Sequence, residues 1–316
     1  MAQRADDLID RRRLRRKLTF WRALAVIILA LAVISLAAWF RDDGLGATTH
    51  IAKVRIAGTI TEDDKLLERL EKIRKSPRVA GVIVQINSPG GTTTGGESIY
   101  EAVRKIAAEK PVVAEVGTLA ASAGYMIASA TDHIVARQSS IVGSIGVLVQ
   151  YPDMTGLMDK LGIKLEEVKS SPLKASPSPF KPTNEEERAM VRRLILDSYD
   201  WFVDIVAERR SMPREQALAL ADGSIFTGRQ GLQNKLVDAL GGEEEAVKWL
   251  ESKGVAPDLR VIEWKPPEGA GSLIWSQALA RTVARALGLP EQSGDMINEL
   301  GMERLFLDGL VSLWHP

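Results

Sequence analysis

The chain has 316 residues, which is enough for one large domain or two modest domains with a hydrophobic core. Its 41 basic and 41 acidic residues balance. The basic excess lies at the N-terminus, so the rest of the chain is mildly acidic and nucleic-acid binding is not expected. The absence of cysteine excludes thiol nucleophiles, disulfides and cysteine-bound zinc.

An uncharged apolar run follows a basic arm at the N-terminus. The arm covers residues 1–22 and is rich in arginine, and the run Ala23–Phe40 contains no charged side chain. As a helix this run spans roughly 27 Å, close to the hydrocarbon thickness of a bilayer. Trp21 and Trp39 stand near its two ends, where interfacial aromatic side chains are expected. The sequence therefore predicts a transmembrane signal anchor over residues 23–40.

The flanking charges predict the orientation of this anchor. Because Arg and Lys accumulate on its N-terminal side, that side is expected in the cytoplasm. Everything after Arg41 is then expected on the outer side of a bacterial plasma membrane, in the periplasm or at the cell exterior. A cleaved signal peptide is the alternative, with Ser35–Ala37 as a small-residue cleavage site. The long basic arm and an apolar run above the usual length of about 7–15 residues favour the uncleaved anchor.

Residues 41–50 form a short polar tether, after which apolar runs alternate with helical patterns. Strands are predicted at Ile51–Ile60, Val79–Ile86, Pro111–Val116 and His133–Ala136, with helices at Glu62–Lys75 and Gly95–Glu109 between the first three. Nearly all of Val79–Ile86 is apolar, as expected for a strand buried on both faces. The β-α-β-α-β order predicts an α/β fold with a mostly parallel sheet and helical crossovers.

Helical patterns dominate the second half of the main domain, which we place at residues 51–265. The capping-box spacing of Thr183–Glu186 predicts the start of a long helix. The Pro/Gly-rich run at 266–271 marks a boundary, so residues 266–316 are predicted as a helical extension. The elements expected between these points are helices at Thr183–Arg210, after Pro213 and at Glu243–Lys253, and a last strand near Leu259–Trp264.

Two glycine-containing turns follow predicted buried strands. The first is INSPGG, in which Gly90 and Gly91 allow the backbone to turn with its N–H groups exposed. Near a helix N-terminus such groups suit a developing oxyanion, although an ordinary strand-to-helix turn has the same pattern. The second is Ala120–Gly124, which has the small-x-Ser-x-Gly spacing of a turn that exposes a nucleophile. Ser122 is therefore a candidate nucleophile, and a structural serine in a tightly packed helix is the alternative.

A nucleophilic serine needs a base, and the three histidines are poorly placed to supply it. His50 lies in the tether, His315 is next to the C-terminus, and His133 is predicted at the start of a strand. Lysine is the remaining candidate, since Ser-Lys pairs are a variant of the catalytic triad. A lysine acts as a base only when burial lowers its pKa enough to populate the neutral form near pH 7.

Three lysines lie in the proline-rich segment 168–182, namely Lys169, Lys174 and Lys181. Lys174 has apolar, proline-stiffened surroundings and no adjacent carboxylate, which favours it, but a structural loop lysine is an equal alternative. The same segment contains Ser171-Pro172-Leu173-Lys174, which matches the S-x-x-K motif of β-lactamases and penicillin-binding proteins. That motif needs a helix, which the prolines oppose, and the chain lacks the accompanying S-D-N and K-T-G motifs.

A series of collinear motifs resembles the signal peptide peptidase A family, also called protease IV. The motifs are INSPGG, AASAGYMIA, GSIGV, Lys-x-x-x-Ser-Pro-Phe-Lys-Pro with EEER, and FTGRQGLQNKLVDALGG, and they extend over roughly residues 51–265. The resemblance implies a ClpP/crotonase-like α/β fold and a serine endopeptidase with a Ser-Lys dyad. Because the chain holds one copy of the motif set, it is similar to the short form of the family.

The resemblance also implies roles for individual residues. Ser122 corresponds to the nucleophile and Lys174 to the general base. The oxyanion hole would be formed by backbone N–H groups of Gly90 or Gly91 and of Ala123. A strand edge that pairs with substrate in the peptide channel is expected at Gly143, Ser144, Ile145 and Gly146. Family members commonly have Ser-Gly-Gly-Tyr-Tyr where this chain has Ser-Ala-Gly-Tyr-Met, a departure that keeps every catalytic group.

The implied function is a membrane-anchored serine endopeptidase that degrades remnant signal peptides and other extended apolar segments, without a metal or other cofactor. Its expected partners are these peptides, the lipid bilayer around residues 23–40, and copies of itself in a homo-oligomeric ring. Short forms resemble rings in which the lysine reaches the serine of a neighbouring protomer, so the dyad lies either within one chain or between two. The alternatives are a non-catalytic crotonase-like scaffold at the membrane, and a related peptidase that acts on intact membrane proteins.

Overall fold

The computed structural model describes residues 20–33, 48–265 and 311–313, and it divides into the units Met1–Thr49 and His50–Pro316. In the first unit, residues 20–33 are helical and their large apolar side chains, such as Ile27 and Leu29, are exposed. The remainder of the predicted anchor, residues 34–40, lies outside the described residues. None of the helices in the described part of the chain combines the length and apolar character that crossing a membrane requires.

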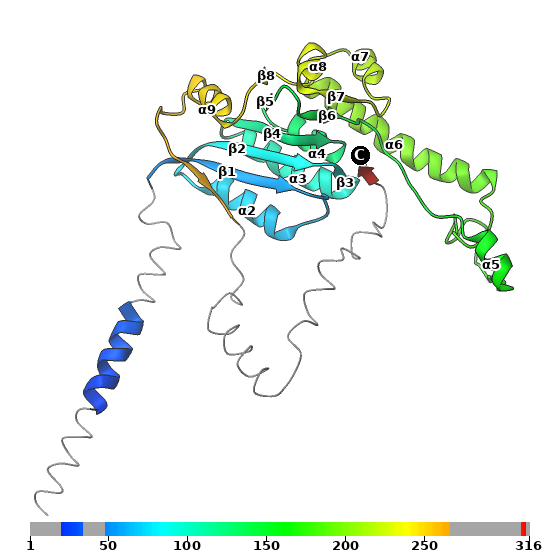
Figure 1. Cartoon of the computed structure of the whole chain (residues 1–316), viewed down its shortest axis with the longest axis horizontal. Coiled ribbons are helices and arrows are strands. Elements are labelled where there is room, and N and C mark those ends of the chain that lie inside the picture. Colours follow the sequence, from blue (N-terminus) through cyan, green and yellow to red (C-terminus); the bar gives the residue numbers. More distant parts are fainter. Residues whose placement is uncertain (1–19, 34–47, 266–310, 314–316) are drawn as a thin grey trace, which may run out of the picture. The chain divides into compact units, whose positions relative to one another are not determined.

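A mostly parallel sheet forms the centre of the second unit (Figure 1). Across the sheet the order is β7-β6-β4-β2-β1-β9, and β5 pairs with both β4 and β8. Strand β7 runs antiparallel to β6, and the other pairings described in this sheet are parallel, which confirms the predicted fold class. The strands are β1 (His50–Ala57), β2 (Val79–Ser88), β4 (Val112–Ala121), β5 (His133–Ala136), β6 (Ile141–Gly143), β7 (Ile225–Thr227), β8 (Ala239–Leu240) and β9 (Val261–Glu263).

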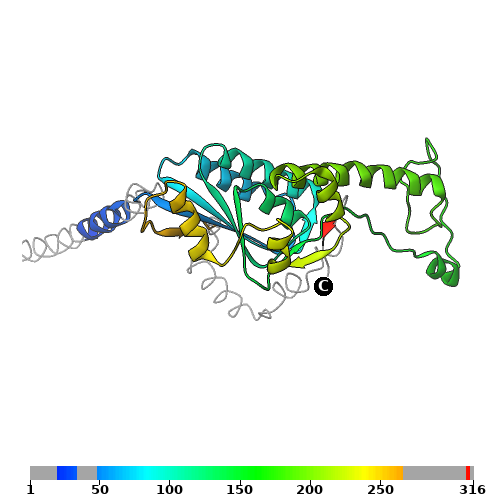
Figure 2. The ribbon, with the colours of Figure 1, turned by 90° about the horizontal axis from the view of Figure 1, so that it is seen from above.

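Helices cover the two faces of this sheet unequally (Figure 2). One face carries α2 (Asp64–Lys75), α3 (Thr93–Ala107), α4 (Ala123–Ser129) and the second half of α6 (Glu185–Arg209), and the other carries α9 (Glu243–Ser252). Because side chains alternate along a strand, Val54 of β1 faces the larger core while Ile51 packs with Leu250 of α9. The remaining helices are α5 (Thr155–Leu161), α7 (Arg214–Ala219) and α8 (Gly228–Gln233).

An arm, defined here as residues 149–194, projects from the body of the second unit and carries α5 at its far end (Figures 1 and 2). The buried apolar residues of α6, from Phe202 to Val206, all lie in the second half of that helix. The first half of α6 therefore extends beyond the core. From Phe202 to the N-cap residue Asn184 the helix covers about 27 Å.

Element boundaries differ from the sequence predictions in a few places. The capping box of α6 is formed by Asn184 and Glu187, one residue later than predicted, because the Asn184 side chain accepts from Glu187 N at 2.9 Å and Glu187 Oε2 accepts from Asn184 N at 3.1 Å. Of the predicted C-terminal helical extension, residues 266–310 and 314–316 lie outside the described residues. Residues 311–313 form strand β10 (Val311–Leu313), because their backbone pairs with a strand edge near α4.

Candidate active site

Ser122 lies at the sharp turn between β4 and α4. Its backbone has φ of 56° and ψ of −121°, a combination that residues other than glycine rarely adopt. Ser122 N–H donates to Gly143 O at 2.8 Å, and Met126 N–H donates to Ser122 O at 2.9 Å, so both sides of the turn are held. A strained strand-turn-helix of this kind is typical of a nucleophile elbow, which presents the serine hydroxyl at the end of a strand.

Small residues around Ser122 permit the close packing of this turn. Ala123 is fully buried, and a Cβ atom on Gly124 would lie 3.0 Å from the carbonyl oxygen of Ser88. A Cβ atom on Gly96 of α3 would lie 3.1 Å from the Ala123 Cβ. The alanine and glycine content of TLAASAGYMIASA thus allows α4 to start directly against β2 and α3.

The glycine turn after β2 forms strand β3 (Gly90–Thr92), which packs against α4. Gly90 has φ of 112°, and a Cβ atom on Gly91 would lie 1.8 Å from Ile60 O, so both positions require glycine. Gly90 N–H donates to Ser88 Oγ at 3.1 Å, whereas Ile60 engages Gly90 O and Thr92 N. Because backbone groups alternate along a strand, the N–H of Gly91 points away from Ile60. Of the two glycines, Gly91 therefore has the N–H group on the edge of β3 that faces away from Ile60.

The edge of β3 that faces away from Ile60 pairs with the C-terminal strand β10 (Figure 1). The two strands are antiparallel, with Ser312 opposite Gly91 and Leu313 opposite Gly90. An extended segment of the chain therefore lies along the backbone of the glycine turn. Addition of a strand to an exposed edge is a common way to bind an extended peptide.

Ser122 lines a pocket of about 520 Å³ beside α6. Most of its lining side chains are apolar, which suits an apolar side chain of a bound peptide. Tyr199 O–H donates to Ala221 O at 2.8 Å and so fixes one wall. The lining consists of Ser122, Ser144, Gly146, Val147, Leu148, Ile195, Leu196, Tyr199, Ala221, Asp222 and Gly223.

The predicted substrate-binding residues of the GSIGV motif have different places in the structure. Gly143, with φ of 99°, ends β6 and accepts the hydrogen bond from Ser122 N–H. Ser144 and Gly146 line the pocket, while Ile145 is buried in the larger core. Both edges of β6 are already paired, with β4 and β7, and Ser144 N–H donates to Ser224 O at 2.7 Å. Two residues of this motif therefore line the pocket, and both edges of β6 are occupied by strands of the same sheet.

Lys174 is not among the residues that line the pocket beside Ser122. It is exposed in the arm, two residues before Ser176, whose side chain hydrogen-bonds to Glu187 in the first turn of α6. The pocket residue Ile195 is about 12 Å from Glu187 along the helix axis. The segment that carries Lys174 is therefore attached near the N-terminal end of α6, away from the helix residues that line the pocket.

The two neighbouring lysines of the arm are engaged in ion pairs. Lys169 Nζ lies 3.0 Å from Glu167 Oε2, and Lys181 Nζ lies 3.3 Å from the same atom. Lys181 also lies 3.1 Å from Glu187 Oε1, whose side chain is 1% exposed. Within the described part of the chain, no side chain pairs with the ammonium group of Lys174. The arm thus presents Lys174, rather than Lys169 or Lys181, as an available amine.

The histidines are remote from Ser122. His133 pairs with Val113 in the sheet, about nine residues or roughly 30 Å before Ser122 along β4. Burial lowers the pKa of His133. His50 begins β1 at the same end of the parallel sheet, and His315 lies outside the described residues. Neither described histidine is placed to accept a proton from Ser122.

The fold and the strained serine define a ClpP-like serine peptidase, and comparison with known proteins agrees. The Clp protease family model matches residues 52–142, and the model described as peptidase family S49 matches residues 104–256. The chain belongs to peptidase family S49 and is an SppA-like serine peptidase.

Individual relatives support this assignment. A protein of Synechocystis sp., named as a candidate protease, is 35% identical over 247 residues, which are 76% of this chain and 88% of that protein. A protein of Enterococcus faecium, named as a candidate signal peptide peptidase SppA, is 34% identical over 232 residues, 73% and 67% of the two chains. Protease 4 of Haemophilus influenzae is 34% identical over 213 residues, which are 64% of this chain but 34% of that protein.

Two structural features beside Ser122 have no clear signal in the sequence. Ile195, Leu196 and Tyr199 line the pocket from α6, and the only sequence signal for them is an apolar stripe on a long helix, which a core helix shares. The pairing of β10 with β3 could not be predicted either, because a strand of three residues has no detectable periodicity.

Proposed function

We propose that this protein is a serine endopeptidase in which Ser122 of one chain and Lys174 of a neighbouring chain form the catalytic dyad. The observation that carries the proposal is the placement of the two groups. Ser122 sits in a strained elbow beside an apolar pocket, whereas Lys174 is exposed at the end of a projecting arm. A head-to-tail ring brings the arm of each protomer to the pocket of the next.

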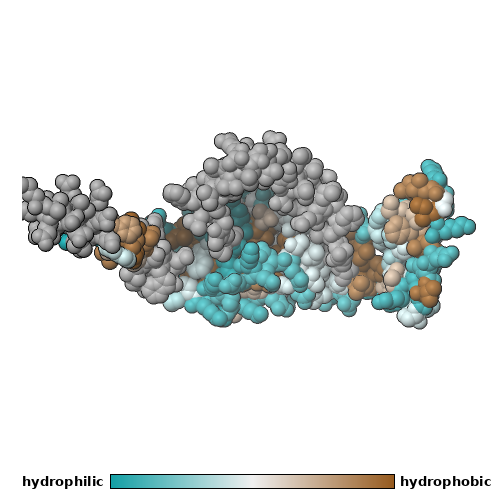
Figure 3. All heavy atoms as spheres, turned by 90° about the horizontal axis from the view of Figure 1, so that it is seen from below, coloured by the Kyte–Doolittle hydropathy of each residue, from teal (hydrophilic) through white to brown (hydrophobic). Residues whose placement is uncertain are grey.

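The arm has the surface expected of such an interface. Its exposed apolar side chains include Leu157, Leu161, Ile163, Leu165 and Val168. Figure 3 shows apolar side chains gathered at the end of the molecule that carries α5. Packing of this surface on a neighbouring chain removes it from water and shields Lys174 from solvent at the same time. Such shielding is what a lysine base requires, because burial favours the neutral amine.

In the proposed mechanism, neutral Lys174 Nζ accepts the Ser122 Oγ proton as Oγ attacks the scissile carbonyl carbon. The N–H groups of Gly91 and Ala123 donate to the oxyanion of the tetrahedral intermediate. When the intermediate collapses, the Lys174 ammonium returns the proton to the departing amine and an acyl-enzyme remains. Water then attacks the ester, again with Lys174 as the base, and releases the acid product and free Ser122.

The substrate is proposed to be an extended apolar peptide, such as a remnant signal peptide. The edge of β3 suits the backbone of such a peptide, and the pocket beside Ser122 suits an apolar side chain. Membrane anchoring through residues 23–40 remains part of the proposal. The basic N-terminal residues 1–22 and the exposed apolar side chains of helix 20–33 support this anchoring. In that orientation the peptidase unit lies in the periplasm or at the cell exterior.

Two variants test whether the protein is a peptidase with these catalytic groups. Ser122→Ala and Lys174→Ala are each expected to lower kcat on an apolar peptide by at least about a thousand-fold. Lys160→Ala is the matched control, because Lys160 is also an exposed lysine of the arm. Labelling of the unaltered protein by a fluorophosphonate, and its loss in Ser122→Ala, checks the nucleophile independently. Full activity in either dyad variant contradicts the mechanism, and activity lost equally in Lys160→Ala contradicts the role of Lys174.

A further inference from the structure

Helix α9 covers only the first part of its face of the sheet. Ile51, Ile83, Val113 and Val135, from the early part of four strands, pack with α9 residues such as Leu250. Towards the carboxyl ends of β1 and β2 the same face carries Arg55, Gln85 and Asn87, and Arg137 follows β5. The sheet therefore changes from an apolar face under α9 to a polar face beyond it.

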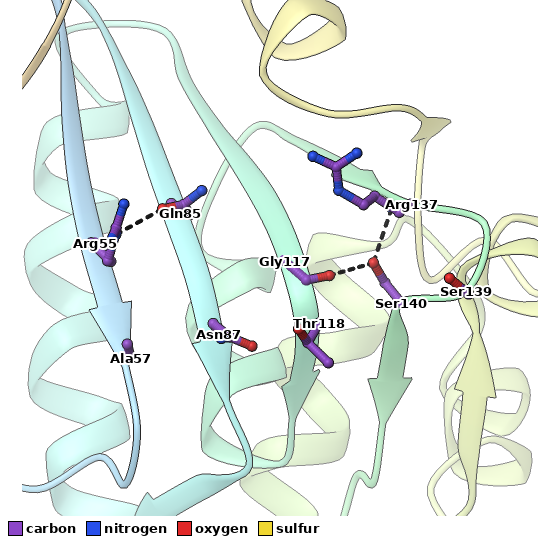
Figure 4. Close-up of a pocket in the computed structure, with 9 residues that line it drawn as sticks. All are labelled: Arg55, Ala57, Gln85, Asn87, Gly117, Thr118, Arg137, Ser139 and Ser140. Atoms are coloured by element: carbon purple, nitrogen blue, oxygen red, sulfur yellow. Dashed lines mark hydrogen bonds between the residues drawn. The ribbon is translucent and has the colours of Figure 1, made fainter.

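The polar part of this face is hollowed. Figure 4 shows the hollow, which has a volume of about 500 Å³ and lies across β1, β2, β4 and the turn between β5 and β6. Its lining contains two guanidinium groups, two carboxamides and three hydroxyls, and within the described residues no carboxylate lines it. The side chains that matter for ligand binding are Arg55, Gln85, Asn87, Thr118, Arg137 and Ser139.

Hydrogen bonds within the chain fix part of this lining. Gln85 Oε1 accepts from Arg55 Nε at 2.9 Å, which orients the guanidinium group. Asn87 Oδ1 accepts from Leu119 N at 3.3 Å, so the Asn87 Nδ2 group remains as a donor. Ser140 Oγ donates to Gly117 O at 2.5 Å and accepts from Arg137 N at 3.0 Å, which anchors the turn that carries Arg137.

The charged groups that line the hollow are the two arginines, and acidic groups stand at its margin. Glu115 on β4 accepts from Gln85 Nε2 at 3.2 Å and pairs with Lys53 at 3.0 Å, which also pairs with Glu243 at 2.5 Å. Arg55 Nε lies 3.8 Å from Glu263 Oε1, so Arg55 is partly balanced. In contrast, the guanidinium group of Arg137 is exposed, and the described residues provide it with neither a hydrogen-bond acceptor nor a carboxylate.

We propose that this hollow binds the phosphoryl group of a ligand. Side chains with hydrogen-bond donors line the hollow on several segments of the chain. They are Arg55 on β1, Asn87 on β2, Thr118 on β4, and Arg137 and Ser139 after β5. A tetrahedral phosphoryl group can accept hydrogen bonds from several donors that do not lie in one plane, whereas a planar carboxylate accepts from one or two such donors. Guanidinium groups also match phosphate oxygens in a bidentate geometry.

The hollow is separate from the pocket beside Ser122, yet it touches the same strand. Thr118 lies on β4, which ends directly before Ser122. Asn87 Oδ1 accepts a hydrogen bond from the N–H of Leu119 on the same strand. The proposed site does not depend on the proposed peptidase mechanism, so each can fail without the other. A phosphoryl group could come from a free phosphate compound or from a phospholipid headgroup, and the test separates these sources.

Isothermal titration calorimetry of the full chain in detergent tests the site with inorganic phosphate, acetate and short-chain phosphatidylglycerol. We expect saturable phosphate binding that exceeds acetate binding, and a loss of about tenfold or more in Arg137→Gln and in Arg55→Gln. Arg229→Gln is the control, because Arg229 is an exposed arginine that contacts Gln138 beside Arg137 but lies outside the hollow. Thermal unfolding of each variant shows that it is folded.

If phosphate and the lipid bind with equal affinity, and Arg137→Gln removes the binding of both, the site is assigned to a free phosphate compound. Tighter lipid binding with the same loss assigns it to a headgroup. Absence of saturable binding by both phosphate probes, acetate binding as tight as phosphate, or an equal loss in Arg229→Gln overturns the proposal.

Discussion

Ser122 N–H donates to Gly143 O at 2.8 Å, and this hydrogen bond joins the nucleophile elbow to the end of β6. Gly143 has φ of 99°, and its strand β6 pairs with β7 on the edge opposite to β4. The conformation of the elbow therefore depends on a glycine far from it in sequence.

Gly143→Ala is expected to displace the elbow. The new Cβ atom would lie 2.9 Å from Phe226 Cδ2 and from Ser224 O, in a backbone conformation that disfavours alanine. A small displacement of a nucleophile lowers kcat by roughly a hundredfold, and positive φ costs about 1–3 kcal/mol of stability. Steady-state kinetics and thermal unfolding measure the two effects. Gly156→Ala, on α5 with no atom within 4 Å of the added Cβ, should leave both unchanged; unaltered kinetics in Gly143→Ala would count against the role of this contact.

Glu187→Gln is expected to release the segment that carries Lys174. The pKa of the buried Glu187 carboxyl is below its usual range. The main cause is a hydrogen bond from the Ser176 side chain, and the Asn184 backbone N–H and the Lys181 ammonium lower the pKa further. Because the pKa is lower in the folded chain, the carboxylate stabilises the arm at pH values above its unfolded pKa. That stability is lost as the pH falls through the lowered folded value.

Hydrogen–deuterium exchange over residues 167–187 measures this effect. Relative to the intrinsic exchange rate at each pH, we expect the variant to lose protection at neutral pH, with a fall in kcat, and the unaltered protein to lose protection only at acidic pH. Glu185→Gln is the control, because the Glu185 side chain lies in the same turn but is 96% exposed. Slow exchange in Glu187→Gln at neutral pH would show that other contacts hold the arm.

Ile195→Phe is expected to narrow the pocket beside Ser122. Peptides with leucine at the cleavage site should lose about tenfold or more in kcat/KM, while peptides with alanine there should lose little. Leu194→Phe is a matched control, since Leu194 is adjacent on α6 but is 54% exposed and lies outside the pocket. Equal losses for both peptides in Ile195→Phe would mean that the pocket does not receive this side chain.

Ser312→Pro is expected to free the edge of β3. Ser312 lies opposite Gly91, and proline has no N–H with which to pair across the two strands. If substrate uses this edge, removal of β10 should lower KM several-fold, by about 1 kcal/mol for the hydrogen bonds released. Ser312→Ala keeps the backbone N–H and should behave as the unaltered chain. A KM that does not change in Ser312→Pro would show that substrate and β10 do not share the edge.

The sheet and its helices could be predicted because buried strands and amphipathic helices leave clear patterns. Val79–Ile86 is a nearly continuous apolar run, and it forms the first eight residues of β2. The short strands β6, β7 and β8 could not be predicted, because two or three residues carry no periodicity, whereas β9 lies within the strand predicted near Leu259–Trp264. Their positions depend on contacts made late in the chain, such as the pairing of β6 with β7.

The candidate site was predictable only in part for a related reason. The small residues around Ser122 are local, so the elbow could be inferred from a short stretch. The position of Lys174 in the arm depends on the length of α6 and on the ion pair between Lys181 and Glu187. The motifs contain these two residues but do not indicate that they are in contact. The polar hollow likewise combines Arg55 and Arg137, which lie on distant segments of the chain.

The dyad shared between chains is tested most directly by mixing two inactive proteins. Ser122→Ala keeps Lys174, and Lys174→Ala keeps Ser122, so a mixed ring contains sites with one intact group from each chain. Reassembly at equal amounts should restore about a quarter of the activity of the unaltered ring, because each head-to-tail site draws its two groups at random. Mixed rings that form, as shown by native mass spectrometry, and yet remain inactive would contradict a dyad shared between neighbouring chains.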